Sequence, residues 1–149
     1  MDLFGSVEQL ALIQLLKSSF VVYPIVNALH IASIGMLLTS VLLLDLSALG
    51  LLRPPGGAAF MALMRRTALI GFASAAATGL LLFSVRAAHY AGLPVFQLKL
   101  GLIVLAGFNL LIFLRLEPRD PGKILRWSAA GSLLIWSGVL LCGRFIGFV

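Results

Sequence analysis

Long apolar runs alternate with short polar segments along the chain, and each run is close to the length of a membrane-spanning helix. A helix needs about 20 predominantly apolar residues to cross the hydrocarbon core of a bilayer. Four segments meet this requirement: residues 20–44, 67–85, 95–114 and 127–148. The pattern therefore predicts an all-α integral membrane protein with four transmembrane helices.

The connections between these segments are short and contain residues that interrupt helices. The motif RPPGG covers residues 53–57, Pro94 opens the third span, and EPRDPGK at residues 117–123 separates the last two spans. Short connections make neighbouring helices antiparallel, which predicts an up-down four-helix bundle and a single domain over residues 1–149. Before the first span, Ser6 and Gln9 fit a capping box, and residues 7–18 are predicted to form a short interfacial helix.

Composition supports a lipid environment. Hydrophobic residues make up 61% of the chain and charged residues 11%, whereas soluble domains average about 45–50% and about 25%. The formal net charge of +6 could indicate nucleic acid, but the basic residues gather at the ends of the apolar runs. That distribution is typical of topology signals, so the expected partner is the lipid bilayer and no nucleic acid is expected.

Basic residues are unequally divided between the two predicted sides. Seven lie in or beside the first and third loops: Arg53, Arg65, Arg66, Arg115, Arg119, Lys123 and Arg126. Four lie on the other side: Lys17, Arg86, Lys99 and Arg144. The positive-inside rule therefore predicts a multi-pass membrane protein with the two basic loops in the cytoplasm and both termini on the outer side.

Two stripes of small residues mark predicted contact faces between helices, since small side chains let helix backbones approach closely in lipid. They are Gly71, Ala75 and Thr78 in the second span, and Gly131, Gly138 and Cys142 in the fourth.

The first span carries four polar residues on one face. With His30 taken as zero, Tyr23 lies at about 20° and both Asn27 and Asp45 lie at about 60° around the helix. Ionisable groups are costly in hydrocarbon, so this face is predicted to point into the bundle. At its cytoplasmic end we expect Asp45 to pair with Arg65 or Arg66, with a proton or cation relay as the alternative.

Near the periplasmic side, His30, Lys99 and Cys142 are predicted to share a depth roughly 7–12 Å below their helix ends. Tyr23, Asn27, Arg86 and Arg144 are predicted to lie nearby, and we call these seven residues the outer cluster. It has several cations, and Glu8 is its close candidate counter-charge. Its candidate ligands are haem propionates, a lipid head group, a quinone or an anionic solute. For Lys99 and Arg144 the alternative is snorkelling to the interface.

Histidine in a membrane span suggests a haem or metal ligand. The second histidine, His89, lies past the apolar end of its span, which leaves a depth mismatch to His30 of roughly 10 Å. Three hypotheses remain for His30: an axial ligand of haem b with another partner, a metal site shared with Cys142, or a hydrogen-bonded structural residue. In span three, Asn109 is expected to hydrogen-bond across helices.

Motifs of known catalytic chemistry are not found in this sequence: it has no phosphate loop, nucleophile elbow or H-E-x-x-H pattern. We therefore assign no catalytic residues and expect no catalytic activity of the chain's own. Trp127 and Tyr90 are expected to anchor at the membrane interfaces.

The segments YPIVNALHIASIGMLLTSVLLLDLSALGL and YAGLPVFQLKLGLIVLAGFN resemble a family of small four-helix bacterial inner-membrane proteins of unknown function. The matching positions are His30, Asp45, Leu46, Leu49, Gly50, Phe96, Lys99 and Asn109. Ser47 departs from the family, which often has arginine there. More distantly, the pattern is similar to copper-resistance membrane proteins and to four-helix b-type cytochromes. Both similarities imply a ligand role for His30.

Two functions follow as hypotheses. The first is a haem-binding or redox-associated membrane subunit with His30 as ligand and Lys99, Arg86 or Arg144 at the propionates. The second is a non-enzymatic accessory subunit, with a membrane-protein partner or a second copy of itself, or a small carrier that binds an anion, lipid or copper.

Overall fold

The computed structural model describes residues 9–116 and 122–148, and the regular structure in these ranges is helical throughout. Four helices are long and apolar enough to cross a membrane: α3 (Val22–Ala48), α4 (Gly57–Val85), α6 (Pro94–Leu116) and α7 (Lys123–Phe145). The predicted class and the predicted number of candidate spans are therefore confirmed.

The long helices extend beyond the predicted apolar segments. α4 begins at Gly57, ten residues before the predicted start, and continues through Arg65 and Arg66 without interruption. The prediction followed hydropathy, but a helix ends where its backbone is interrupted and not where its side chains become polar. Here the interruption is Gly56, whose φ of 79° lies in the left-handed region that glycine tolerates.

A break at Arg86 separates α4 from a short helix, α5 (Ala87–Gly92). Arg86 has φ −142° and ψ 51°, and Leu93 is extended, as expected of a residue that precedes proline. The second span therefore ends at Val85, as predicted. His89 belongs to α5 and not to the second span, in agreement with its predicted position past the apolar end of that span.

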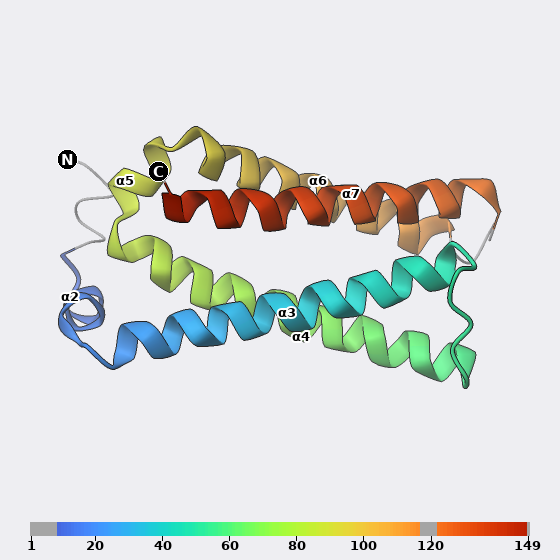
Figure 1. Ribbon diagram of the computed structural model, residues 1–149, viewed down its shortest axis with the longest axis horizontal. Coiled ribbons are helices and arrows are strands. Elements are labelled where there is room, and N and C mark those ends of the chain that lie inside the picture. The colour runs from blue at the N-terminus through green and yellow to red at the C-terminus, as the bar shows by residue number, and fades with distance from the viewer. Residues whose placement is uncertain (1–8, 117–121, 149) are drawn as a thin grey trace.

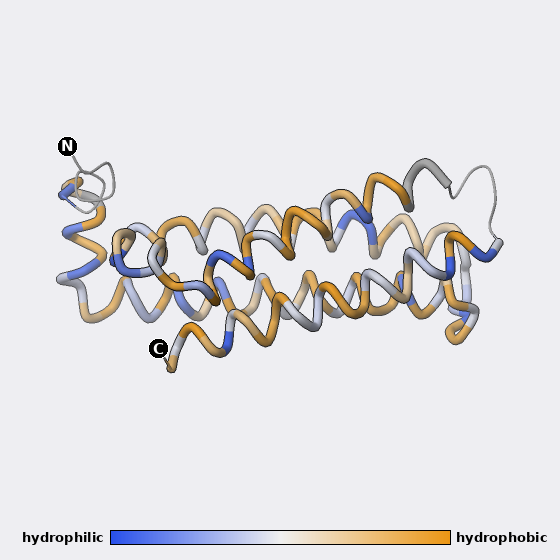
Figure 2. The backbone as a smooth tube through the Cα atoms, turned by 90° about the horizontal axis from the view of Figure 1, so that it is seen from above, coloured by the Kyte–Doolittle hydropathy of each residue, from blue (hydrophilic) through white to orange (hydrophobic). Residues whose placement is uncertain are grey.

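The N-terminal helix α2 (Ala11–Ser18) crosses one end of the bundle at a steep angle to the long helices (Figures 1 and 2). Its Ile13 and Leu16 are each 4% exposed, and it packs on α4 and α3. The backbone N–H of Val22 then donates to Ser19 Oγ over 3.1 Å at the start of α3. α2 begins at Ala11 without a side-chain cap, and Ser6 of the predicted capping box lies outside the described residues.

Consecutive long helices run in opposite directions along the bundle (Figure 1). The closest associations are within two hairpins, α3 with α4 and α6 with α7, while α3 and α7 join the hairpins. The backbones of α4 and α6 approach each other less closely, and near the α5 break the rings of Phe83 and Phe96 stack between these two helices with centroids 5.2 Å apart. We call the end with α2, α5 and the C-terminal 3-10 helix η1 (Ile146–Phe148) the α5 end, and the opposite end, with the two hairpin connections, the loop end.

Small residues mark the closest approaches within each hairpin. A Cβ on Gly71 would lie 2.8 Å from the backbone nitrogen of Leu37, so α3 and α4 cross almost backbone to backbone. A Cβ on Gly138 would lie 3.1 Å from Leu102 Cδ1 on α6. The prediction was wrong for Gly131, which has nothing within 4 Å, because the buried face of α7 passes through Ser128, Ala129 and Ser132 instead.

Candidate functional site

His30 lies on the seam between α3 and α4, near the α5 end. Its Cε1 is 3.0 Å from the position of a Cβ on Gly79, so the imidazole uses the space that this glycine leaves. His30 Nδ1 is 3.0 Å from Thr78 Oγ1. The Thr78 hydroxyl also lies 2.7 Å from the carbonyl oxygen of Ser74. We assign the hydroxyl as the donor to that carbonyl, so that His30 Nδ1–H donates to Thr78 Oγ1; in this tautomer Nε2 carries the lone pair.

Lys99 extends from α6 toward α7 at the same end of the bundle. Its Nζ is 3.6 Å from the position of a Cβ on Gly143, and the ammonium interacts electrostatically with Cys142. Lys99 is also close enough to His30 to interact with it electrostatically. The structure thus brings together the three residues that were predicted to share a depth, one from each of three long helices.

Tyr90 forms the rim of this region with Tyr23 and Arg86. Burial raises the pKa of Tyr90 above its ordinary value of 10.0, the nearby Tyr23 adds to the rise, and Arg86 opposes it. The Tyr90 ring lies 6.4 Å from that of Phe96 and 5.6 Å from that of His89, measured between centroids. Tyr23 and Arg86 are exposed, so they lie at the mouth of the cluster and not inside it.

Two more members of the predicted outer cluster, Arg144 and Asn27, are exposed, as Tyr23 and Arg86 are. The Arg144 guanidinium carbon is 4.5 Å from the ring centroid of Phe148, a cation–π geometry on an exposed part of the chain. Asn27 is exposed, and within the described residues no hydrogen bond joins it to another side chain. His89 is also exposed. The alternative of an interfacial position therefore suits Arg144, whereas Lys99 is half-buried.

The residues around His30 offer haem or a metal ion one strong ligand, the imidazole of His30. A hydrogen bond from one ring nitrogen is the usual way in which proteins orient a ligating histidine, and the contact of His30 Nδ1 with Thr78 fits that arrangement, with Nε2 as the ligand atom. Among the described residues, no group of three histidine, cysteine or acidic side chains could hold a metal ion. The outer cluster therefore provides one strong ligand, one ammonium and one thiol.

A second polar region lies in the half of the bundle near the loop end. Asp45 is 4% exposed, and Ser132 of α7 is within hydrogen-bonding reach of its carboxylate. Its Oδ2 atom is buried and has no hydrogen-bond partner among the described residues. Asp45 lines a cavity of about 310 Å³ to which all four long helices contribute.

The predicted ion pair of Asp45 stays a prediction. Arg65 lines the same cavity, while Arg66 is exposed on α4. Within the described part of the chain, Oδ2 of Asp45 has no hydrogen-bond partner, so neither arginine donates to that oxygen.

Asn109 forms the interhelical contact that was expected of it. Its Nδ2 donates to the carbonyl oxygen of Ser128 over 3.0 Å, and Ser128 Oγ donates back to Asn109 Oδ1 over 2.9 Å. This reciprocal pair joins α6 to α7 and confirms the predicted structural role.

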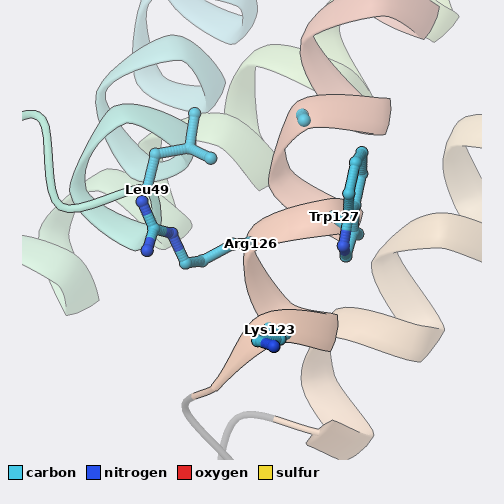
Figure 3. A pocket seen from close by; sticks show the side chains of 5 residues that line it. Leu49, Lys123, Arg126 and Trp127 are labelled. Carbon is cyan, nitrogen blue, oxygen red and sulfur yellow. The ribbon is translucent and has the colours of Figure 1, made fainter.

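A basic pocket of about 380 Å³ lies at the loop end, lined by Leu49, Lys123, Arg126, Trp127 and Ala130. Figure 3 shows Arg126 directed toward Leu49, at the C-terminus of α3, and Trp127 on the other side of α7. A cation there complements the helix dipole of α3. Trp127 is 77% exposed, which suits an interfacial anchor.

Sequence reasoning missed the partners of the polar residues: Thr78 for His30, Ser128 for Asn109, and Ser132 and Trp136 beside Asp45. Thr78 was visible as part of the Gly71 stripe, but only as a small residue. Ser128 and Ser132 are spaced four residues apart on α7, the same helical face, and that spacing was the available signal.

Comparisons of this chain with protein-family models, with curated proteins and with solved structures find no match. Its function is therefore argued from the geometry of its sites.

Proposed function

We propose that the protein is a four-span protein of the bacterial inner membrane, an up-down bundle with both termini in the periplasm and α2 at the outer interface. The proposal is supported by the opposite directions of consecutive long helices and by the larger share of lysine and arginine near the loop end. The α5 end then faces the periplasm.

Cysteine accessibility tests this orientation. In a Cys142→Ser background, a cysteine replaces Gly92 at the α5 end or the exposed Ala58 at the loop end. An impermeant maleimide added to intact cells is expected to label the first position and not the second. Labelling in the opposite order would reverse the orientation.

In this membrane we propose a non-enzymatic role, as an accessory subunit or small carrier that binds an anionic group at the α5 end. The supporting observation is Lys99, a half-buried ammonium that packs against α7 beside Cys142 and near His30. In the described ranges the sole carboxylate is Asp45, which belongs to the other half of the bundle. A phosphate or carboxylate of the ligand would supply the missing negative charge.

Native mass spectrometry of the detergent-purified chain tests this role. Bound phosphatidylglycerol is expected to exceed bound phosphatidylethanolamine, and Lys99→Gln is expected to remove this preference. Lys123→Gln is the matched control, because Lys123 is an exposed lysine at the loop end. Equal retention of both lipids by the parent chain and by Lys99→Gln would contradict anion binding at Lys99.

Haem b is the second candidate, and one observation favours it: the hydrogen bond between His30 Nδ1 and Thr78 orients the ring of a histidine that would hold the iron through Nε2. Bound haem would supply electron transfer, and Lys99 would lie near its propionates. A Soret band in protein from haem-replete cells, lost in His30→Ala and kept in His89→Ala, is the expected result. A colourless preparation would exclude this candidate, and copper analysis of the same sample would test a His30–Cys142 metal site.

A further inference from the structure

The cavity beside Asp45 is a different site from the outer cluster. It lies between the two hairpins, in the loop-end half of the bundle, and its α3 wall runs from Leu37 to Asp45. Its volume of about 310 Å³ is at the lower end of the range for small-molecule sites. The walls are mainly aliphatic and aromatic, so the cavity suits a ligand with a substantial apolar part.

The cavity also has a specific polar feature. Asp45 is 4% exposed and lines it, with Oδ2 buried and lacking a hydrogen-bond partner in the described residues. Ser132 is within reach of the carboxylate but leaves that oxygen unsatisfied. A buried carboxylate without a partner is costly in an apolar environment, and a cation or a hydrogen-bond donor on the ligand would remove this cost.

Access follows from how the helices associate. Three sides of the bundle are formed by contacts, α3 with α4, α3 with α7, and α6 with α7. The fourth side lies between α4 and α6, whose rings of Phe83 and Phe96 stack at the α5 end and not at the cavity. Beside the cavity, Phe72 of α4 and Leu110 of α6 line the wall and are 43% and 46% exposed. A ligand dissolved in the membrane can therefore reach the cavity laterally between α4 and α6.

The charged and aromatic groups that line the cavity restrict where the positive charge of a ligand can lie. Arg65 lines the α4 side, so a ligand cation is disfavoured there by like charge. On the α7 side, Ser132 and Trp136 are four residues apart and share a face. A cation between Asp45 and this face would contact a carboxylate and an indole ring, which attracts cations through its π face.

From these observations we infer that the cavity between the two hairpins binds a membrane-soluble organic cation, a lipophilic ammonium, with its charge on Asp45 beside Trp136 and its apolar part against the aliphatic walls. A neutral apolar ligand and a lipid chain are the competing occupants, and neither requires the carboxylate.

The test compares a cation with its neutral isostere. The probes are benzyltrimethylammonium and neopentylbenzene, added to the detergent-purified full chain. Trp127→Phe leaves Trp136 as the one tryptophan, since the sequence has two, so its fluorescence reports on the cavity. We expect a saturable change with the cation, and binding roughly thirtyfold weaker or more for the isostere and for Asp45→Asn. Equal binding of the two probes, or unchanged affinity in Asp45→Asn, would overturn the inference.

Two further variants keep the test decisive. Ala106→Leu places a larger side chain in the cavity wall without touching the carboxylate, and is expected to abolish binding of the cation. If Asp45→Asn does not fold, Ala106→Leu and the comparison of the two probes together test the proposed site. Unchanged binding of the cation by Ala106→Leu would show that the cation binds elsewhere. Lys99→Gln should bind the cation normally, so this inference and the anion site at the α5 end can fail separately.

Discussion

His30 and Asp45 are both ionisable residues of α3, and the bundle accommodates them in opposite ways. His30 lies within a hairpin, where α4 provides both a hydroxyl partner and a glycine for the ring to rest on. Asp45 lies between hairpins, where Ser132 is in reach but one carboxylate oxygen has no partner. The difference shows that polar groups are satisfied where two helices pack closely, and remain available to a ligand where the helices separate.

The same contrast applies to the helix pairs. Within α3–α4 and α6–α7, glycines allow close approach and polar side chains pair across the seam. Between α4 and α6 no glycine of the described residues allows a comparable approach; the rings of Phe83 and Phe96 stack near the α5 end, and the cavity lies in the other half. In lipid, where apolar side chains gain little by leaving the solvent, such packing and hydrogen bonds hold helices together.

The largest expected effect on stability comes from adding a side chain at the closest contact between α3 and α4. Gly71→Ala places a Cβ 2.8 Å from the Leu37 backbone, so α3 and α4 must separate. We expect a loss of about 1–3 kcal/mol in the free energy of unfolding, measured by denaturation in detergent. The matched control is Gly101→Ala on α6, which meets nothing within 4 Å and should stabilise slightly through its helix propensity. Equal stability of the two variants would mean that α3 and α4 do not cross at Gly71.

A smaller effect is expected at the Asn109–Ser128 pair. Asn109→Leu and Ser128→Ala each remove one or both of the hydrogen bonds that join α6 to α7. Hydrogen bonds between membrane helices average about 0.6 kcal/mol and reach about 1.7. A double-mutant cycle on unfolding is expected to give a coupling energy of about 1 kcal/mol. Additive effects of the two substitutions would show that the pair is not coupled.

His30 and Thr78 should show a similar but weaker coupling. Thr78→Val removes the hydroxyl that accepts from His30 Nδ1, whereas Thr78→Ser keeps it. We expect Thr78→Val to lose about 0.6 kcal/mol of stability and Thr78→Ser to lose less. Nitrogen chemical shifts of the imidazole give the tautomer: Nδ1–H in the parent chain and a mixed state in Thr78→Val. A mixed state in the parent would contradict the assigned hydrogen bond.

The smallest effect concerns Tyr90, outside the spans. Its pKa is raised above 10.0, so at high pH the unfolded chain releases this proton before the folded chain does. Stability should therefore fall as pH rises through and above 10, and this part of the fall should disappear in Tyr90→Phe. Arg86→Gln should raise the pKa further, as followed by tyrosinate absorbance, because Arg86 opposes the shift. A lower pKa in Arg86→Gln would contradict the contact.

Much of the fold could be predicted from the sequence, because the position of a membrane-spanning helix depends mainly on the length of an apolar run. The four segments, the end of the second span at Val85 and the role of Gly71 as a close-contact position were all predicted. The extension of α4 back to Gly57 and the break at Arg86 were not, since helix ends depend on backbone conformation that hydropathy does not measure.

For the polar residues, too, some properties could be predicted from the sequence and others depend on the tertiary structure. Their types, their approximate depths and the shared face of α3 follow from composition and from the helical period, which are properties of one chain segment at a time. Their partners are properties of two segments, and depend on how each helix is rotated and where it crosses its neighbour. The rotation and crossing of the helices bring the Thr78 hydroxyl to His30 and Lys99 to Cys142. They leave one oxygen of Asp45, a residue that lines the cavity, without a hydrogen-bond partner in the described residues.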